Sequence, residues 1–285
     1  MFLVRVFSLL MVIACFDLQL IADDGPVASL ESSSFLNNGV TAHRGNSSEF
    51  PENTLPAFES GIEIGADWIE LDIFTTKDGK LVVIHARTTQ RVGDKNLVVP
   101  DSTYNQLLTV DVATDFRKRM QKTIDECPMQ KIPLLEDVLK IVMKQNRTRV
   151  SIQPKMDCVA QAVALVKRLN AESWVGFNDG NLQYMIEVKR LAPEIPVFWD
   201  RGADTNIEED IQIANQHGFE ILVLHQSGVT SEKVQKVKTA GLDFGAWTVN
   251  ECTTMETLLD MGVDRLYTDH PRMLLKLKWI GSSAR

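Results

Sequence analysis

The sequence lacks the marks of a protein that binds duplex nucleic acid. Its 285 residues include 38 acidic and 30 basic side chains, so the formal net charge is −8. Proteins that bind duplex nucleic acid carry a basic surface, and this charge balance argues against that class. Small anionic substrates stay compatible, because a few local cations and a metal ion can outweigh a global negative charge.

Cysteine is scarce, and its spacing matches no zinc motif. Beyond the first 22 residues the chain has only Cys127, Cys158 and Cys252. In an exported chain this odd number leaves at least one thiol free or paired with another molecule. A Cys127–Cys158 disulfide and free thiols are both compatible with the sequence.

Long apolar segments are also absent. The run Val6–Phe16 is too short to span a bilayer as a helix, and it follows Arg5, the single charge of the first 16 residues. A charge followed by an apolar run is typical of a signal peptide. Cleavage near Ala22 fits, and the residues before Cys15 resemble a bacterial lipoprotein cleavage box. We therefore predict a signal peptide or lipoprotein leader over residues 1–22. The protein would be exported, periplasmic or secreted, with a lipidated Cys15 as its only possible membrane anchor.

No glycine-rich nucleotide loop follows the first predicted strand, which disfavours a doubly wound open sheet. After a polar linker over residues 23–38, β-rich runs alternate with amphipathic helical runs. Strands are predicted at Val40–His43, Trp68–Phe74, Val150–Lys155, Trp174–Phe177, Pro196–Trp199, Ile221–His225, Phe244–Val249 and Arg265–Thr268. Helices are predicted at Thr54–Ile64, Leu134–Gln145, Val159–Leu169, Leu182–Leu191, Glu208–His217, Ser231–Ala240 and Met255–Met261. Eight strands alternating with helices predict a single α/β domain, a TIM (β/α)8 barrel, over residues 39–278.

One unit interrupts this alternation after the second strand. Asp78-Gly79 lies between two strand-like runs and is typical of a β-hairpin turn. Residues 86–132 then follow, rich in charge and weak in periodicity. We interpret this segment as an insertion over one face of the barrel, because long loops of this kind are often lids or binding loops.

Polar residues collect where the predicted strands end, which is where barrel enzymes keep their reacting groups. Glu70 and Asp72 are two residues apart on a strand, so both side chains project from one face, while apolar Ile69, Leu71 and Ile73 project from the other. Two unpaired carboxylates inside a barrel are costly, and a bound Mg²⁺ or Ca²⁺ would offset that cost. The alternative is an exposed edge strand with an acidic face.

A second pair with the same spacing lies on the third predicted strand. Gln153 offers an amide oxygen to a metal, and Lys155 offers a compact positive charge to a phosphate. Arg44 is suited to a two-pronged grip on phosphate oxygens. His43 and His85 can each transfer protons near neutral pH.

These residues lie in motifs that resemble the glycerophosphodiester phosphodiesterase family over roughly residues 40–275. The matching motifs are His43-Arg44-Gly45, Pro51-Glu52-Asn53-Thr54, Ala57-Phe58, Gly65-Ala66-Asp67, Ile69-Glu70-Leu71-Asp72, Thr75-Thr76-Lys77-Asp78-Gly79, Val82-Val83-Ile84-His85, Ile132 to Leu139, Trp247-Thr248-Val249-Asn250 and Thr268-Asp269-His270-Pro271. The resemblance implies a TIM barrel of the phospholipase C-like phosphodiesterase type. It also implies hydrolysis of glycerophosphodiesters to an alcohol and glycerol phosphate.

The resemblance implies a role for each matching residue. His43 and His85 would be the general acid and base, and Arg44 and Lys155 would bind the phosphate. Glu70, Asp72 and Gln153 would hold a divalent metal, Mg²⁺ or Ca²⁺. Glu52 would orient Arg44 or help the metal, and Trp247 would be either an aromatic wall beside the glycerol moiety or a core tryptophan.

Two positions depart from the family pattern. The family's Glu-x-Lys reads Gln153-Pro154-Lys155, so the third ligand loses its charge, and its His-Asp reads His85-Ala86. These changes keep two alternatives open: a weakened or inactive phosphate-binding barrel, and a lysophospholipase D-type phosphodiesterase. Among other polar residues, His225, Asp179 and Asp200 end predicted strands and could line a pocket, whereas His217 and His270 are interpreted as structural.

Overall fold

The computed structural model describes residues 35–283, with side chains described up to residue 279. The predicted leader, Cys15 and most of the predicted linker lie outside these residues. None of the helices in the described part of the chain is both long and apolar enough to cross a membrane.

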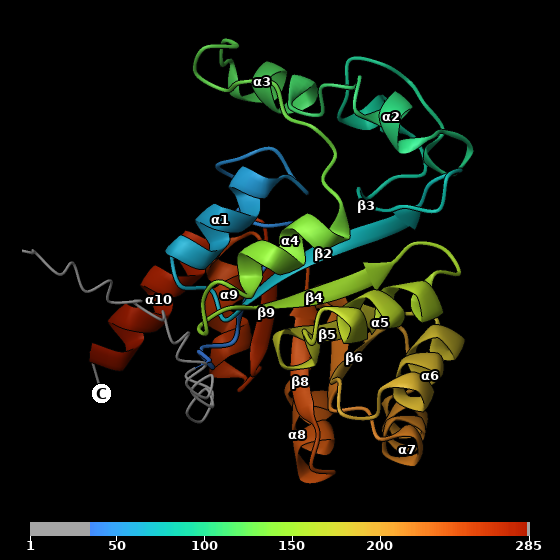
Figure 1. Cartoon of the computed structure of the whole chain (residues 1–285). Helices are drawn as coiled ribbons and strands as arrows, with labels where there is room; N and C mark the ends of the chain where they lie inside the picture. The colour runs from blue at the N-terminus through green and yellow to red at the C-terminus, as the bar shows by residue number, and fades with distance from the viewer. Residues whose placement is uncertain (1–34, 284–285) are drawn as a thin grey trace, which may run out of the picture. The chain divides into compact units, whose positions relative to one another are not determined.

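Eight parallel strands close into a barrel, as the sequence predicts (Figure 1). They are β1 Val40–Ala42, β2 Trp68–Thr75, β4 Arg149–Pro154, β5 Val175–Asp179, β6 Val197–Arg201, β7 Ile221–His225, β8 Asp243–Trp247 and β9 Arg265–Thr268. Each strand pairs with the next, and β1 pairs with both β2 and β9, which closes the ring. The TIM-barrel prediction is confirmed.

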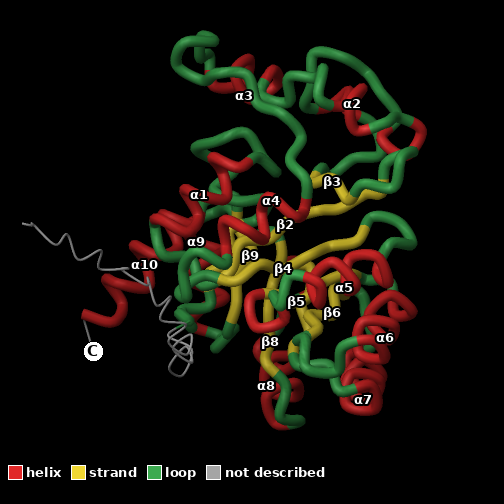
Figure 2. Tube along the Cα trace, in the orientation of Figure 1, coloured by secondary structure: helices red, strands yellow, loops and turns green. Residues whose placement is uncertain are grey.

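Helices cover the outside of the strands (Figure 2). They are α1 Leu55–Glu63, α4 Leu135–Val142, α5 Val159–Arg168, α6 Leu182–Leu191, α7 Ile207–His217, α8 Ser231–Thr239, α9 Cys252–Asp260 and α10 Pro271–Ser283. The seven predicted helices are present within a few residues, and α10 was not predicted. Trp174 was assigned to a strand, but it closes the 3-10 turn Glu172–Trp174, and β5 begins at Val175.

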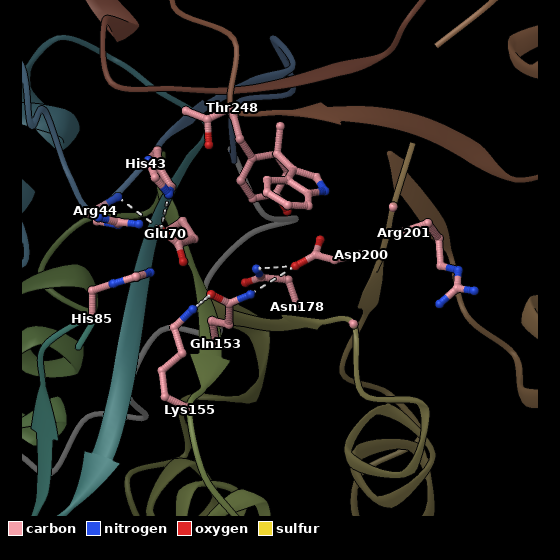
Figure 3. Close-up of a pocket in the computed structure, with 14 residues that line it drawn as sticks. His43, Arg44, Glu70, His85, Gln153, Lys155, Asn178, Asp200, Arg201 and Thr248 are labelled. Atoms are coloured by element: carbon pink, nitrogen blue, oxygen red, sulfur yellow. Dashed lines mark hydrogen bonds and ion pairs between the residues drawn. The ribbon is translucent and has the colours of Figure 1, made fainter. Parts of the chain in front are cut away.

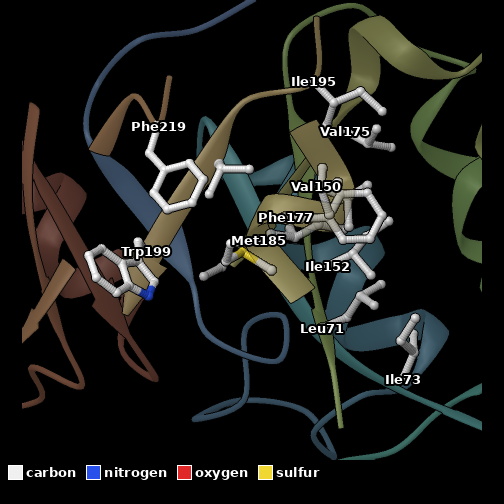
Figure 4. Packing of buried hydrophobic residues seen from close by; sticks show 14 of the residues in the cluster. Leu71, Ile73, Val150, Ile152, Val175, Phe177, Met185, Ile195, Trp199 and Phe219 are labelled. Atoms are coloured by element: carbon white, nitrogen blue, oxygen red, sulfur yellow. The ribbon is translucent and has the colours of Figure 1, made fainter. Parts of the chain in front are cut away.

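The alternation along β2 sorts its side chains between two environments. Ile69, Leu71 and Ile73 point outward into the main hydrophobic core beneath the helices. Figure 4 shows Leu71 and Ile73 in this core. Trp68 points inward, where its ring meets Phe198 edge-on at 4.9 Å. The same alternation places Glu70 and Asp72 inside the barrel, so the exposed-edge alternative for this strand is wrong.

The predicted hairpin and insertion are both present. Strand β3 (Leu81–Val83) runs antiparallel to β2, and Gly79 adopts the left-handed φ of 75° that the turn requires. The insertion contains 3-10 turns at Thr89–Arg91 and Val99–Asp101 and short helices α2 (Tyr104–Leu107) and α3 (Thr114–Met120). Its apolar side chains pack on the hairpin in a cluster formed by Phe74, Val82, Ile84, Val92, Val99, Leu107, Val110, Val112 and Ile132. The insertion is therefore a packed lobe rather than a bare loop.

The three cysteines of the described part are free. Cys127 packs with Phe116 in the insertion, whereas Cys158 packs in the main core. The structure therefore does not form the Cys127–Cys158 disulfide.

Candidate active site

A cavity of about 510 Å³ opens at the carboxyl ends of the strands (Figure 3). Its lining residues come from seven of the eight barrel strands or the segments after them, and from the segment after β3: His43, Arg44, Glu70, His85, Gln153, Lys155, Asn178, Gly180, Asp200, Arg201, Gly202, Trp247, Thr248 and Tyr267. All but two of the predicted site residues line it. Asp72 is fully buried behind the lining, and Glu52 lies behind Arg44.

His43 follows β1 and is held by an acidic partner. Its Nδ1–H donates to Asp269 Oδ1 at 2.7 Å, and its Nε2 lies 4.0 Å from Glu70 Oε2. Asp269 is itself fixed by Ser47 Oγ at 3.0 Å and Asn250 Nδ2 at 2.7 Å. Burial lowers the pKa of His43, but the hydrogen bond to Asp269 and the charge of Glu70 outweigh it and raise the pKa above its usual value.

The other predicted histidine is in the opposite electrostatic situation. His85 follows the hairpin strand β3, and its Nδ1 has no hydrogen-bond partner among the described residues. Burial lowers the pKa of His85 to about 4, since the nearby cations Arg44 and Lys155 add to burial and oppose the pull of Asp72. His85 is therefore neutral at pH 7. Ala86 contributes no carboxylate that would reverse this.

Arg44 is held from three directions. Its backbone N–H donates to Glu70 Oε2 at 3.0 Å, its Nη1 donates to Glu52 Oε1 at 3.2 Å, and its Nε lies 3.5 Å from Asp72 Oδ2. This arrangement fixes the guanidinium at the cavity wall, where the sequence places a phosphate-binding group.

The backbone that presents these groups is unusual. Arg44 and Asn53 adopt positive φ angles of 58° and 56°, which side-chain-bearing residues rarely take. Gly45 has a φ of 80°, and a Cβ there would lie 2.7 Å from the backbone carbon of Ala57. The His-Arg-Gly motif therefore needs glycine for both conformation and space.

Glu52 links the barrel to the insertion. Its Oε2 accepts from Arg91 Nη1 at 2.6 Å, and its Oε1 accepts from both Arg91 and Arg44. Burial would raise the pKa of Glu52, but these arginines lower it. Both carboxylate oxygens of Glu52 are thus occupied by arginines, and one of these arginines is Arg44. Arg91 was not found from sequence, because nothing in the weakly periodic insertion distinguishes it from other surface arginines.

The pKa values of the two inward carboxylates of β2 are shifted in opposite directions. Burial and the neighbouring charge of Asp72 raise the pKa of Glu70 to about 7. Burial would also raise the pKa of Asp72, but Lys155 and Arg44 lower it below its usual value. Asp72 Oδ2 accepts from Asn53 Nδ2 at 2.8 Å, and Asp72 Oδ1 pairs with Lys155 Nζ at 3.0 Å.

The predicted third ligand, Gln153, lies beside this pair. Its Oε1 accepts from Lys155 Nζ, and its Nε2 donates to Asp200 Oδ2 at 3.1 Å. The described residues contain no cluster of three His, Cys, Asp or Glu side chains suited to a metal. Glu70, Asp72 and the Gln153 amide oxygen nevertheless form a set of hard oxygen donors, and the buried Asp72 Oδ1 already faces one cation, Lys155 Nζ, as an ion pair without a hydrogen bond. This set fits a divalent cation such as Mg²⁺ or Ca²⁺, with two carboxylates rather than three.

Part of the cavity wall is aromatic and acidic. Trp247 lines it and also meets His225 edge-on at 5.1 Å, so it is both a cavity wall and a packing residue. Asp200 lines the cavity, where burial raises its pKa to about 8. Asp179 and His225, which also end strands, are not among the lining residues.

Comparison with known proteins agrees with this geometry. The model of the glycerophosphoryl diester phosphodiesterase family matches residues 43–273. The chain belongs to this family. It is 31% identical over 248 residues to a glycerophosphodiester phosphodiesterase from Caldanaerobacter subterraneus, covering 84% of this chain and 96% of the relative. It is 33% identical over 243 residues to the uncharacterized protein YqiK of Bacillus subtilis, covering 81% and 95%.

Solved structures show the same fold for this family member. A glycerophosphodiester phosphodiesterase from Parabacteroides distasonis superposes with a TM-score of 0.72 at 26% identity, covering 88% of this chain and all of the other. An Oleispira antarctica phosphodiesterase, solved with its product sn-glycerol-3-phosphate, gives 0.72 at 22% identity over 83% and 95% of the two chains. The family, the fold and the enzyme class predicted from sequence, a phosphoric diester hydrolase, are confirmed.

Proposed function

We propose that this enzyme hydrolyses glycerophosphodiesters to an alcohol and glycerol phosphate with His43 and His85 as its proton-transfer pair. The observation that carries the proposal is that two histidines line one cavity in opposite electrostatic surroundings, which raise the pKa of His43 and lower the pKa of His85. His43, whose pKa is raised by its hydrogen bond to Asp269, donates a proton to the leaving oxygen. His85, kept neutral, accepts the proton of the attacking hydroxyl. Two groups whose pKa values are pushed apart divide the acid and base roles.

The remaining site residues bind the phosphate, the cation and the glycerol moiety and do not transfer protons. Arg44 and Lys155 bind the phosphoryl oxygens, and Glu70, Asp72 and the Gln153 oxygen would hold a divalent cation. When bound, that cation supplies charge that stabilises the negative phosphoryl oxygens in the transition state. Trp247 offers an aromatic face to the glycerol moiety. The product found in the Oleispira antarctica structure is the product class expected here.

The direct test is an assay of glycerol phosphate release. Purified, metal-stripped protein is given glycerophosphocholine or glycerophosphoethanolamine with Mg²⁺, with Ca²⁺ or with chelator. We expect release with at least one metal and loss of release with chelator, because the bound cation would stabilise the charge on the phosphoryl oxygens in the transition state.

The same assay separates the alternatives. Absence of release from folded protein with every metal would favour a phosphate-binding barrel that no longer turns over. A parallel assay with a lysophospholipid tests the lysophospholipase D-type alternative. Faster cleavage of that substrate than of the deacylated diesters would replace the glycerophosphodiester proposal.

The pH profile of kcat/KM should depend on Asp269. A neutral His85 is required, so the rate rises as pH increases through the His85 pKa. A protonated His43 is also required, so the rate falls as pH increases through the raised His43 pKa. Asp269→Asn removes the negative partner at 2.7 Å, so we expect the alkaline limb to move to lower pH while the acid limb stays in place. An unmoved alkaline limb would show that another group sets it.

A further inference from the structure

The amide of Gln153 lies between two groups with opposite hydrogen-bonding demands. On one side, Lys155 Nζ donates to Gln153 Oε1. On the other side, Asp200 Oδ2 accepts from Gln153 Nε2 at 3.1 Å. Figure 3 shows this series of contacts crossing the cavity floor.

This arrangement selects one of the two orientations of the amide. The oxygen and nitrogen ends of glutamine have nearly the same shape, so packing alone does not distinguish them. A lysine ammonium only donates, and it therefore requires the oxygen of Gln153. In the opposite orientation, the NH₂ group would face both the ammonium and the carboxylate-lined position where a cation would bind. The amide oxygen would then face Asp200.

Asp200 is itself oriented by buried neighbours. Asn178 Nδ2 donates to Asp200 Oδ2 at 3.1 Å, and Ser151 Oγ donates to Asn178 Oδ1 at 2.6 Å. Ser151 and Asn178 are buried. Because both donors reach the same oxygen of Asp200, that oxygen stays an acceptor even when the other oxygen carries a proton. Donation therefore converges on Asp200, from Ser151 through Asn178 on one side and from Gln153 on the other.

We propose that Asp200 is a positioning residue that makes glutamine serviceable as the third metal ligand, by holding the Gln153 oxygen toward Asp72 and Glu70. The inference rests on the proposed function, because it concerns the cation assigned to that site. A glutamate in this position would bring an oxygen to either side and need no such orientation. In this proposal the Gln153 oxygen, oriented by Asp200, replaces the glutamate oxygen of the family pattern.

The pairing has a consequence for restoring the family residue. In Gln153→Glu, a carboxylate oxygen would replace the nitrogen that now lies 3.1 Å from Asp200 Oδ2. Two carboxylates at that distance repel each other and would push the new ligand oxygen out of place. The added negative charge should therefore strengthen metal binding only when Asp200 is also changed, as in the double variant Gln153→Glu/Asp200→Asn.

The test is calorimetric titration of the metal-stripped protein with Mn²⁺, Mg²⁺ or Ca²⁺ and without substrate. Asp200→Leu removes the acceptor, and we expect metal affinity to fall about 10- to 100-fold, as for other groups that orient a ligand. Asp200→Asn keeps one oxygen for both donors and should stay close to wild type. The double variant Gln153→Glu/Asp200→Asn should bind more tightly than Gln153→Glu alone.

Three results would each overturn the proposal: wild-type protein that binds none of the three metals, Asp200→Leu that binds as tightly as wild type, or Asp200→Asn that binds as weakly as Asp200→Leu. The last would mean that Asp200 acts by charge and not by orientation. If Asp200→Leu does not fold, the test is the comparison of Gln153→Glu with Gln153→Glu/Asp200→Asn. Tighter metal binding by Gln153→Glu than by the double variant would contradict the inference. Metal affinity that depends on Asp200 in protein without hydrolytic activity would reject the proposed function and keep this inference.

Discussion

Replacing His43 with alanine is expected to lower kcat by about 10²- to 10⁴-fold, the usual contribution of a positioned general acid. The variant loses the proton donor that Asp269 holds at 2.7 Å. Arg44 and Lys155 still line the cavity, so KM should change little. Steady-state kinetics of glycerophosphodiester hydrolysis, with the metal that supports wild-type activity, measure both quantities.

His217→Ala is the matched control for this variant. His217 ends helix α7 and stacks on Phe219 with ring centroids 5.8 Å apart, and it is not among the cavity-lining residues. We expect its kcat to match wild type. Retention of most activity in His43→Ala would remove His43 from the reaction, and an equal loss in both variants would indicate a general structural effect.

The largest expected effect on stability comes from a buried ion pair inside the barrel, at the end opposite the cavity. Arg265 Nη2 lies 3.2 Å from Asp67 Oδ2, which also accepts from the backbone N–H of Gly39 at 3.1 Å. Asp67 is fully buried and Arg265 is 5% exposed. Arg265→Met leaves the Asp67 charge buried without its partner. We expect the free energy of unfolding to fall by about 3–5 kcal/mol.

Denaturant and thermal unfolding measure this loss, and the midpoint temperature should fall by on the order of 10 °C. Arg272→Met is the control, because Arg272 pairs with Glu49 at 2.8 Å on the surface with its side chain 60% exposed. Exposed ion pairs contribute less than about 1 kcal/mol, so this variant should unfold near wild type. If both arginine variants lost similar stability, burial would not be what makes the Asp67 pair important.

Local sequence patterns were sufficient to predict the barrel and the two inward carboxylates of β2. The strand period of two residues placed Glu70 and Asp72 on one face and Ile69, Leu71 and Ile73 on the other, as the structure has them. This succeeded because the direction of a strand side chain depends only on its own backbone. Helix α10 was missed because the sequence prediction assigned no element after the last predicted strand, which ends at Thr268.

The hydrogen-bond partners of the predicted site residues could not be predicted from local patterns. Asp269 is 226 residues from His43, and Asp200 is 47 residues from Gln153. Asp269 lies in a motif that the resemblance covers, but the motif does not say which side chain it touches. Arg91 reaches Glu52 from the insertion, whose path along the barrel depends on how its apolar cluster packs on the hairpin.

The order of residue types along the chain thus specified which side chains face inward, where the strands end and which chemistry collects there. Closure of the barrel decided which of those groups meet, because it brings the ends of β1, β4, β6 and β9 around one cavity. The difference in pKa between the two histidines also depends on the tertiary structure. His43 and His85 are the same residue type with the same intrinsic pKa, and only burial, hydrogen bonding and the surrounding charges raise the pKa of one and lower the pKa of the other.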